Sequence, residues 1–315
     1  MTTSFWDGKR VLVTGGAGFV GTRVVSQIMK AGNPEQIYVP RSKSTDLRVW
    51  EDCVRAVKDI DIVIHLAANI GGIEYNQNNP GRLFYDNAIM GIQLLEAARK
   101  EDVDKVVIAG TICAYPNYTP LPFSEEDLWC GYPEPTNAPY GLAKKMLLVQ
   151  SQAYREEYDF NSIYLLPVNL YGPGDTFGDD RSHVIPALIK RFVEAKDKKS
   201  PSVTVWGTGL ASREFLYVDD CARAFVLATE KYNKADPVNI GSGMEISIRD
   251  LANLIASLTG YEGKIKFDST KPDGQPRRWL NIKRAEEEFG FRATVPMRAG
   301  LEKTILWYKQ SGGTQ

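Results

Sequence analysis

The chain has 315 residues, 43% of them hydrophobic and 24% charged, and its formal net charge at pH 7 is -1. These values are typical of a globular protein with a substantial core, and they exclude the disordered, collagen-like and coiled-coil classes. The 38 basic and 39 acidic residues nearly balance, so nothing in the charge favours binding to nucleic acid or to an anionic membrane.

The first half of the chain alternates short β-rich runs with helical stretches. The pattern predicts five strands, at Arg10–Thr14, Gln36–Val39, Asp61–Leu66, Lys105–Ala109 and Ser162–Leu166. It predicts three main helices between them, at Phe19–Lys30, Leu83–Lys100 and Tyr140–Tyr158. This alternation predicts an α/β protein of the Rossmann type, with a doubly wound parallel sheet.

After Asn169 the alternation becomes irregular. We expect a helix at Val184–Ala195, a pairing of Val203–Trp206 with Ile265–Phe267, and a strand at Val238–Ile240 that returns to the main sheet. The sequence therefore predicts a cofactor domain over residues 1–170 and a smaller α/β substrate domain over residues 171–315.

The cysteines and histidines form no metal or disulfide pattern. The four cysteines are scattered, none is part of a C-x-x-C pair, and there are two histidines. The apolar run that begins at Val11 is too short for a signal peptide, and no stretch approaches the ~20 apolar residues of a membrane span. We expect a cytoplasmic protein without a metal.

A glycine-rich turn joins the first predicted strand to the first predicted helix, and it comprises Gly15, Gly16, Ala17, Gly18, Phe19, Val20 and Gly21. Glycines let a backbone turn tightly and approach a pyrophosphate, whose charge the helix N-terminus stabilises. A plain glycine turn is the alternative. The strand before the turn and the helix after it favour a dinucleotide site.

The end of the second predicted strand indicates which nicotinamide cofactor binds. A carboxylate at this place accepts the ribose hydroxyl of NAD, whereas an arginine accommodates the phosphate of NADP. Here Arg41 and Ser42 follow the strand and no carboxylate does, which favours NADP(H). An exposed arginine without a ligand is the alternative, and Asp46 keeps NAD open.

Tyr140 and Lys144 stand four residues apart on one predicted helix, so both lie on one face. A cation near a phenol stabilises the phenolate and lowers the tyrosine pKa from about 10. The pair therefore predicts proton transfer by Tyr140 near neutral pH.

The glycine turn followed by Tyr-x-x-x-Lys resembles the extended short-chain dehydrogenase/reductases. In that superfamily a Ser or Thr after the fourth strand binds the substrate oxygen beside the tyrosine, and Thr111 occupies this position. The resemblance also implies cofactor contacts after the fifth strand, from Pro167, Asn169 and Leu170, and from Lys144.

Several longer blocks are similar to the GDP-L-fucose synthase family. They are Gly110–Pro116, Glu134–Tyr140, Asn169–Pro173, Ser182–Leu188, Trp206–Gly209, Arg213–Asp220 and Lys271–Gly274. The resemblance implies an NADPH-dependent epimerase/reductase that converts GDP-4-keto-6-deoxymannose to GDP-L-fucose, by 3,5-epimerisation followed by reduction at carbon 4. It also implies a homodimer.

By the same resemblance, Cys113 and His183 carry the proton transfers of the epimerisation. Protons beside a ketone are acidic, and inversion needs a base and an acid on opposite faces. A small core residue and a structural histidine are the alternatives. The resemblance further implies a nucleotide-sugar pocket lined by Asn169, His183, Arg191, Trp206, Arg213, Lys271 and Asn281, although without it Arg191 and Trp206 would be assigned to a helix surface and to the core.

Three positions depart from that family. Ala17 belongs to a generic form of the glycine turn, Asn69 stands where a lysine is usual, and Asn281 stands where an aspartate is usual. An enzyme for another nucleotide 4-keto sugar, such as a GDP-heptose, is therefore an alternative. A nucleotide sensor without turnover is a further alternative, disfavoured because Tyr140, Lys144 and Cys113 are all present.

Overall fold

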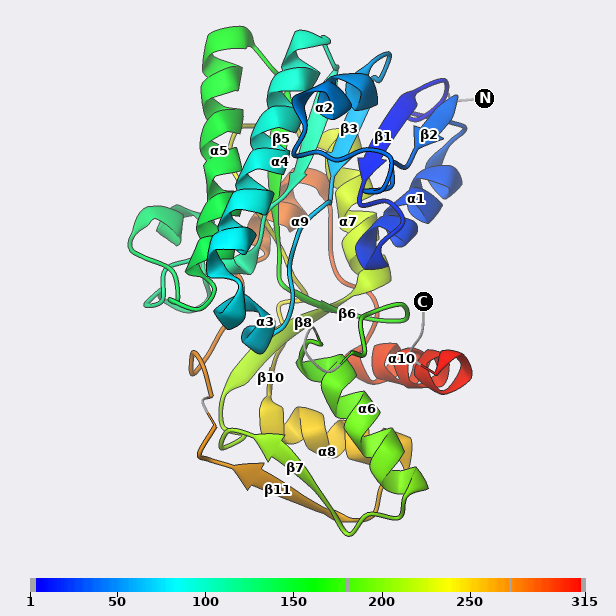
Figure 1. The fold of residues 1–315 in the computed structure, drawn as a ribbon, viewed down its shortest axis with the longest axis vertical. Coiled ribbons are helices and arrows are strands. Elements are labelled where there is room, and N and C mark those ends of the chain that lie inside the picture. Colours follow the sequence, from blue (N-terminus) through cyan, green and yellow to red (C-terminus); the bar gives the residue numbers. More distant parts are fainter. Residues whose placement is uncertain (1–3, 179–181, 272, 313–315) are drawn as a thin grey trace.

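The computed structural model describes residues 4–178, 182–271 and 273–312. Six strands form one parallel sheet in the order β2-β1-β3-β4-β5-β9 (Figure 1). Their bounds are β1 (Arg10–Thr14), β2 (Gln36–Tyr38), β3 (Ile62–His65), β4 (Lys105–Ala109), β5 (Ser162–Pro167) and β9 (Val238–Ile240). The Rossmann-type sheet that the sequence predicts is confirmed.

Helices cover both faces of this sheet. On one face lie α2 (Trp50–Val57), α4 (Pro80–Lys100) and α5 (Ala138–Tyr158), and on the other lie α1 (Phe19–Ala31) and α7 (Val218–Lys231) (Figure 1). Two short elements belong to the connections that follow β3 and β4, namely α3 (Ile73–Asn78) and the 3-10 turn η1 (Ile112–Ala114), and η2 (Glu125–Trp129) comes later in the second connection. Near β9 packs α9 (Lys283–Phe289).

The remaining elements form a second layer of structure below the carboxyl ends of the main strands (Figure 1). One sheet has the order β10-β8-β6, and a second pairs β11 with β7 in parallel. The bounds are β6 (Asn169–Tyr171), β7 (Ser202–Trp206), β8 (Ser212–Tyr217), β10 (Glu245–Ser247), β11 (Lys264–Asp268), α6 (Val184–Asp197), α8 (Ile248–Thr259) and α10 (Met297–Ser311).

Two hydrophobic cores correspond to these two regions. The larger fills the space between the main sheet and its helices, and the smaller joins α6, α8 and α10. Helix α6 buries Ile185, Leu188, Ile189 and Phe192, which recur at the spacing of one helical face. None of the described helices combines the length with the apolar composition that a membrane-spanning helix requires.

Glu214 on β8 links three segments through its buried carboxylate. One oxygen accepts backbone N–H groups from Ser242 and Gly243, which follow β9, and the other accepts the N–H of Leu280 at 2.7 Å. Buried amides that donate to a carboxylate form strong, charge-assisted hydrogen bonds. Glu214 therefore fixes the Leu280 segment against the end of the main sheet.

We expect Glu214→Gln to lower the free energy of unfolding by about 2–3 kcal/mol, because an amide NH₂ would face backbone donors in place of a charged acceptor. Urea denaturation measures this change. Glu287→Gln is the matched control, since Glu287 pairs with Lys283 on the surface and such pairs contribute about 0–1 kcal/mol. Equal, small effects of both substitutions would contradict the role of Glu214.

Candidate active site

The glycine turn after β1 is shaped for a close approach of its backbone. Gly15 has φ +69°, and a Cβ atom there would lie 2.9 Å from the backbone nitrogen of Ala67. A Cβ at Gly21 would collide with the carbonyl of Gly15, so α1 can begin this close to β1 only with glycine. Gly18 is the N-cap of α1, and the first turn of the helix carries no acidic residue. This turn therefore fits a dinucleotide pyrophosphate.

Arg41 and Ser42 are exposed just beyond β2, near the same turn. A Cβ at Gly16 would contact Val39, which places the turn against the end of this strand. The carboxylate of Asp46 is held by the guanidinium of Arg48 at 2.8 Å, and this hydrogen bonding lowers the Asp46 pKa. Asp46 is thus already paired, whereas within the described chain Arg41 forms no ion pair.

Three predicted side chains meet just after β4. Thr111 is the N-cap of η1, and its Oγ1 accepts the backbone N–H of Cys113 at 3.1 Å. Tyr140, at the start of α5, interacts with both of these side chains. A Cβ at Gly141 would lie 2.8 Å from the carbonyl carbon of Cys113. The glycine after Tyr140 therefore lets α5 pack directly on η1 and brings the phenol to Thr111.

The pKa of Tyr140 is raised, not lowered as the sequence predicts. Burial of the phenol is the main cause and the charge of Cys113 adds to it, while the Thr111 hydroxyl opposes it. The prediction of a lowered tyrosine pKa is wrong here because burial of the phenol outweighs the hydrogen bond with Thr111, and Lys144 is not among the groups that shift the Tyr140 pKa. Burial instead lowers the pKa of Lys144 to about 8. At neutral pH, Tyr140 is a phenol that can donate a proton.

A pH dependence follows from Lys144. Its ammonium is charged below about pH 8 and neutral above, so we expect the reaction rate to fall as the pH rises through this value. Lys144→Met removes the titrating group, and its lower residual rate should not change between pH 7 and pH 9. Initial rates across this range measure both profiles. An identical alkaline decline in the Met variant would assign the titration to another group.

Two further buried residues lie near Lys144, and the sequence analysis does not identify either of them as part of the site. The phenol of Tyr164 on β5 donates to the backbone carbonyl of Lys144 at 2.9 Å. His65 is the last residue of β3, and its imidazole is fully buried. Its Nδ1 atom lies at hydrogen-bond distance, 2.8 Å, from Thr14 Oγ1. Burial and the charge of Lys144 lower the His65 pKa well below its ordinary value. His65 is therefore a neutral neighbour of the site.

The structure brings three of the side chains predicted to bind the nucleotide sugar into contact, and it places a fourth, Arg213, near them. Trp206 at the end of β7 is half-exposed, and the cations of Arg191 and Lys271 lie 5.6 and 5.3 Å from its ring centroid. Arg213 on β8 donates to the carbonyl of Asp273 at 3.0 Å, two residues beyond Lys271. An indole with two cations beside it, and a third cation at the neighbouring Asp273, can contact a charged, planar ligand.

Among the described contacts, none joins the other predicted residues to Trp206 or to its two cations. Asn281 donates to Ser124 Oγ at 3.3 Å and accepts the N–H of Lys283, so its side chain holds local loop structure. His183 is the N-cap of α6 and part of its surface is exposed, while desolvation of the imidazole lowers its pKa. Among the described hydrogen bonds, none joins His183 to Cys113.

Asn169 donates to the Glu214 carbonyl at 3.0 Å. Pro167 at the end of β5 and Leu170 on β6 flank Asn169 in the chain.

Asn69 is one of the three positions that differ from the residues usual in the GDP-L-fucose synthase family. Its side chain belongs to a polar hydrogen-bond network. Its amide donates to Asp86 on α4 at 2.9 Å, its oxygen accepts from Tyr75, and its backbone pairs with Asn87. Asp86 also pairs with Arg48. Asn69 therefore anchors the segment after β3 to α4.

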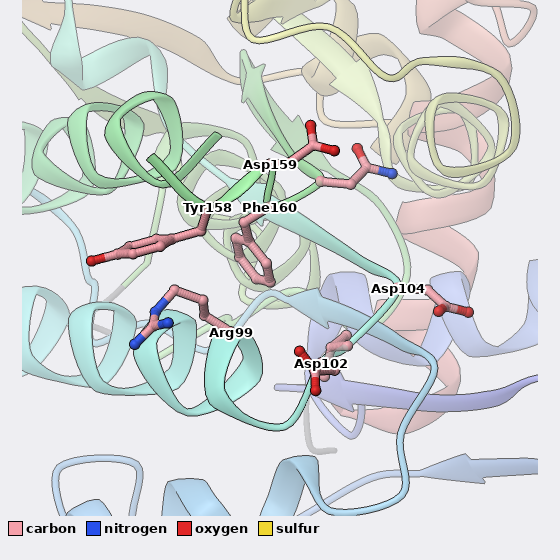
Figure 2. A pocket seen from close by; sticks show the side chains of 8 residues that line it. Arg99, Asp102, Asp104, Tyr158, Asp159 and Phe160 are labelled. Carbon is pink, nitrogen blue, oxygen red and sulfur yellow. The ribbon is translucent and has the colours of Figure 1, made fainter. Parts of the chain in front are cut away.

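A surface pocket lies at the amino ends of β4 and β5, at the edge of the main sheet opposite to the predicted site. Figure 2 shows its lining residues, which include Arg99, Asp102, Asp104 and Tyr158. These residues precede β4 and β5 or end α4 and α5. Ligands of open α/β sheets bind at the carboxyl ends of strands, so this pocket is not the cofactor or substrate site. No cluster of metal-binding side chains occurs in the part of the chain that is described.

Comparisons with known proteins agree with this geometry. Residues 11–241 match the NAD dependent epimerase/dehydratase family. The chain is 38% identical over 308 residues to "Probable GDP-L-fucose synthase 1" of Oryza sativa subsp. japonica, with 96% of this chain and 93% of the relative covered. It is 36% identical to the GDP-L-fucose synthase of Escherichia coli (strain K12), with 96% and 97% covered.

A crystal structure of a GDP-L-fucose synthetase from Naegleria fowleri bound to NADP has the same fold. It superposes with a TM-score of 0.89 at 28% identity, covering 99% of this chain and 96% of that one. The chain thus belongs to the NAD dependent epimerase/dehydratase family and, over nearly its whole length, resembles the GDP-L-fucose synthases.

Proposed function

We propose that the protein is an NADPH-dependent epimerase/reductase that converts GDP-4-keto-6-deoxymannose to GDP-L-fucose. The observation that carries this proposal is the cluster of Thr111, Cys113 and Tyr140 after β4, with Lys144 one turn further along α5. The cluster combines a thiol, a proton-donating phenol and a hydroxyl within one small region. The relatives named GDP-L-fucose synthase support the choice of reaction and substrate.

The glycine turn and the residues around it bind the cofactor. The turn from Gly15 to Gly21 faces the pyrophosphate, Arg41 and Ser42 bind the 2′-phosphate, and Lys144, Pro167, Asn169 and Leu170 lie toward the nicotinamide. When bound, NADPH supplies the hydride that reduces carbon 4. The pairing of Asp46 with Arg48 supports NADP over NAD, because that carboxylate is already occupied.

We expect Arg41→Ala to weaken NADPH by about tenfold and NADH hardly at all, because a guanidinium binds a phosphate that only NADPH carries. Titration of each cofactor by fluorescence gives the two dissociation constants. Arg55→Ala, which removes an exposed arginine from α2, should leave both unchanged. Equal losses of NADPH and NADH in the Arg41 variant would remove the phosphate assignment.

In the epimerisation, Cys113 as the thiolate removes the proton beside the ketone, and the electron pair of the broken C–H bond moves to the ketone oxygen. The electron pair then returns from the oxygen to the carbon, which takes a proton on its opposite face from His183 as the imidazolium. The exposed position of His183 at the N-cap of α6 leaves it free to meet a ligand. Inversion at two carbons requires this sequence at each of them.

In the reduction, Tyr140 donates its phenolic proton to the oxygen at carbon 4, while Thr111 holds that oxygen. Burial keeps the phenol protonated at neutral pH, which suits an acid in this direction of the reaction. The nucleotide binds along Arg191, Trp206, Arg213 and Lys271, where cations meet the pyrophosphate and the indole packs on the base or sugar.

The protein assembles as a homodimer through α4 and α5. These helices pack against each other, and each also exposes large apolar side chains, namely Phe84 and Tyr85 on α4 and Met146 and Val149 on α5. Exposed apolar surface of this kind favours association. Light scattering after size exclusion should give twice the chain mass, and a monomer would contradict this part of the proposal.

The function is tested by mixing the purified protein with GDP-4-keto-6-deoxymannose and NADPH. Loss of NADPH absorbance together with GDP-L-fucose in the NMR spectrum is the expected result. NADPH oxidation with a GDP-heptose but not with the deoxymannose derivative would reassign the substrate. Cofactor binding without turnover of either sugar would contradict the enzyme assignment.

A further inference from the structure

A buried arginine that is distant in sequence contacts the sulfur of Cys113. The guanidinium of Arg278 donates from Nη2 to Cys113 Sγ at 3.1 Å, although 165 positions separate the two residues. Only 8% of Arg278 is exposed. Neither the glycine turn nor the Tyr-x-x-x-Lys pair includes this residue, and the sequence alone does not distinguish it from its neighbour Arg277.

The backbone around Arg278 is held firmly. Its carbonyl accepts the N–H of Glu214 at 3.1 Å, the Pro276 carbonyl accepts the N–H of Ser212, and the N–H of Leu280 donates to the Glu214 carboxylate. The segment therefore lies along β8 like an added strand. This arrangement directs alternate side chains of the segment to opposite sides, and Arg277 is exposed and pairs with Glu245 while Arg278 is buried.

The charge of Arg278 lacks a carboxylate partner within the described chain, and its buried Nε has no hydrogen-bond acceptor. Its charged and titratable neighbours are Cys113 itself, Tyr140 beside that thiol, and Arg213, whose pKa is lowered by burial and by Arg278. Arg278 and the neighbouring Arg213 together raise the positive electrostatic potential around the Cys113 sulfur. A buried, unpaired guanidinium is costly, and an anion beside it offsets that cost.

We propose that Arg278 is a positioning residue that holds Cys113 as the thiolate and directs its sulfur toward the sugar. The thiolate is the form of cysteine that acts as a base, and a cation in contact with the sulfur stabilises it. This inference deepens the proposed function and rests on it for the step at which Cys113 removes a proton. The contact itself can be tested without any sugar.

The test measures alkylation of Cys113 by iodoacetamide in the Cys130→Ser protein, with the modified residue identified by mass spectrometry. Cys130 is the exposed cysteine and would dominate the reaction, whereas Cys53 and Cys221 are buried. Because only the thiolate reacts, Arg278→Met should slow alkylation of Cys113 by about tenfold at pH 7. At pH 10, where thiols ionise without help from a nearby cation, the two rates should converge.

Two variants make the result specific. Arg278→Lys keeps a cation and should restore most of the rate at pH 7, and Arg277→Met changes the exposed neighbour and should leave the rate unaltered. Circular dichroism establishes that each variant is folded. An Arg278→Met rate equal to that of the parent at pH 7, or a rate that is equally slow at both pH values, would overturn the inference.

A second readout separates this inference from the proposed function. With the sugar substrate in deuterated buffer, Arg278→Met should incorporate deuterium more slowly at pH 7 and recover at higher pH. Slower alkylation with unchanged deuterium incorporation would support the Arg278 contact and refute Cys113 as the base. Unchanged alkylation would refute the contact whatever the sugar does.

Discussion

Tyr140→Phe should lower the rate of ketone reduction by about 10²–10⁴-fold, the usual effect of removing a general acid. The substitution removes only the hydroxyl, so the ring still fills its buried place at the start of α5. NADPH binding should change little, since the phenol interacts with Thr111 and Cys113 and not with the glycine turn. Stopped-flow absorbance and a cofactor titration measure the two quantities.

Tyr164→Phe is the matched control for this prediction. It also removes one phenolic hydroxyl from a buried tyrosine, and that hydroxyl binds the Lys144 carbonyl and no reacting group. We expect a smaller loss of rate, of about tenfold or less, consistent with the ~1 kcal/mol of one hydrogen bond. A Tyr140→Phe enzyme that retains a tenth or more of the wild-type rate would refute Tyr140 as the acid.

Cys113→Ser should slow proton exchange at carbons 3 and 5 by about 10²-fold or more, because a serine hydroxyl is far less acidic than a thiol and does not supply the base. Binding of the nucleotide sugar should persist, since the cations around Trp206 are unaltered. Deuterium incorporation from the solvent, followed by NMR, measures the exchange.

Cys130→Ser serves as the control in the same assay, because it changes an exposed cysteine on the loop after η2. Its exchange rate should match that of the unmodified protein. If Cys113→Ser exchanges both protons at the unmodified rate, another group must be the base.

The regular half of the fold could be predicted from the sequence. The buried strands β1 and β4 have the predicted bounds, and β5 extends one residue further than predicted. These strands are apolar runs bounded by turn residues, so local periodicity identifies them. The pairing of β7 with β11 was also predicted, although 57 residues lie between Trp206 and Lys264.

The sequence does not predict the three-stranded sheet β10-β8-β6, because its strands are held together by contacts between residues distant in sequence. β6 has three residues and lies beside β8, while β10 pairs with β8 from the other side. The three residues of β6 give no period to detect. Glu214, the buried link between these segments, is a single acidic residue whose neighbours in sequence do not reveal its partners.

The candidate site was predicted in its parts and not in its electrostatics. The positions of Tyr140, Lys144 and Thr111 follow from spacing and from resemblance. The raised pKa of Tyr140 follows from burial, which depends on the packing of α5 against η1 and is absent from the sequence. The contact of Arg278 with Cys113 likewise depends on β8, which sets the side chain that faces inward.

The central claim is that one site both inverts and reduces the sugar, and one measurement tests it most directly. The protein is incubated with GDP-4-keto-6-deoxymannose and NADPH in deuterated buffer, and the product is examined by NMR. We predict GDP-L-fucose with deuterium at carbons 3 and 5 and one NADPH oxidised per product. A reduced product without deuterium at these carbons would contradict the account, because the protein would then be a reductase without epimerase activity.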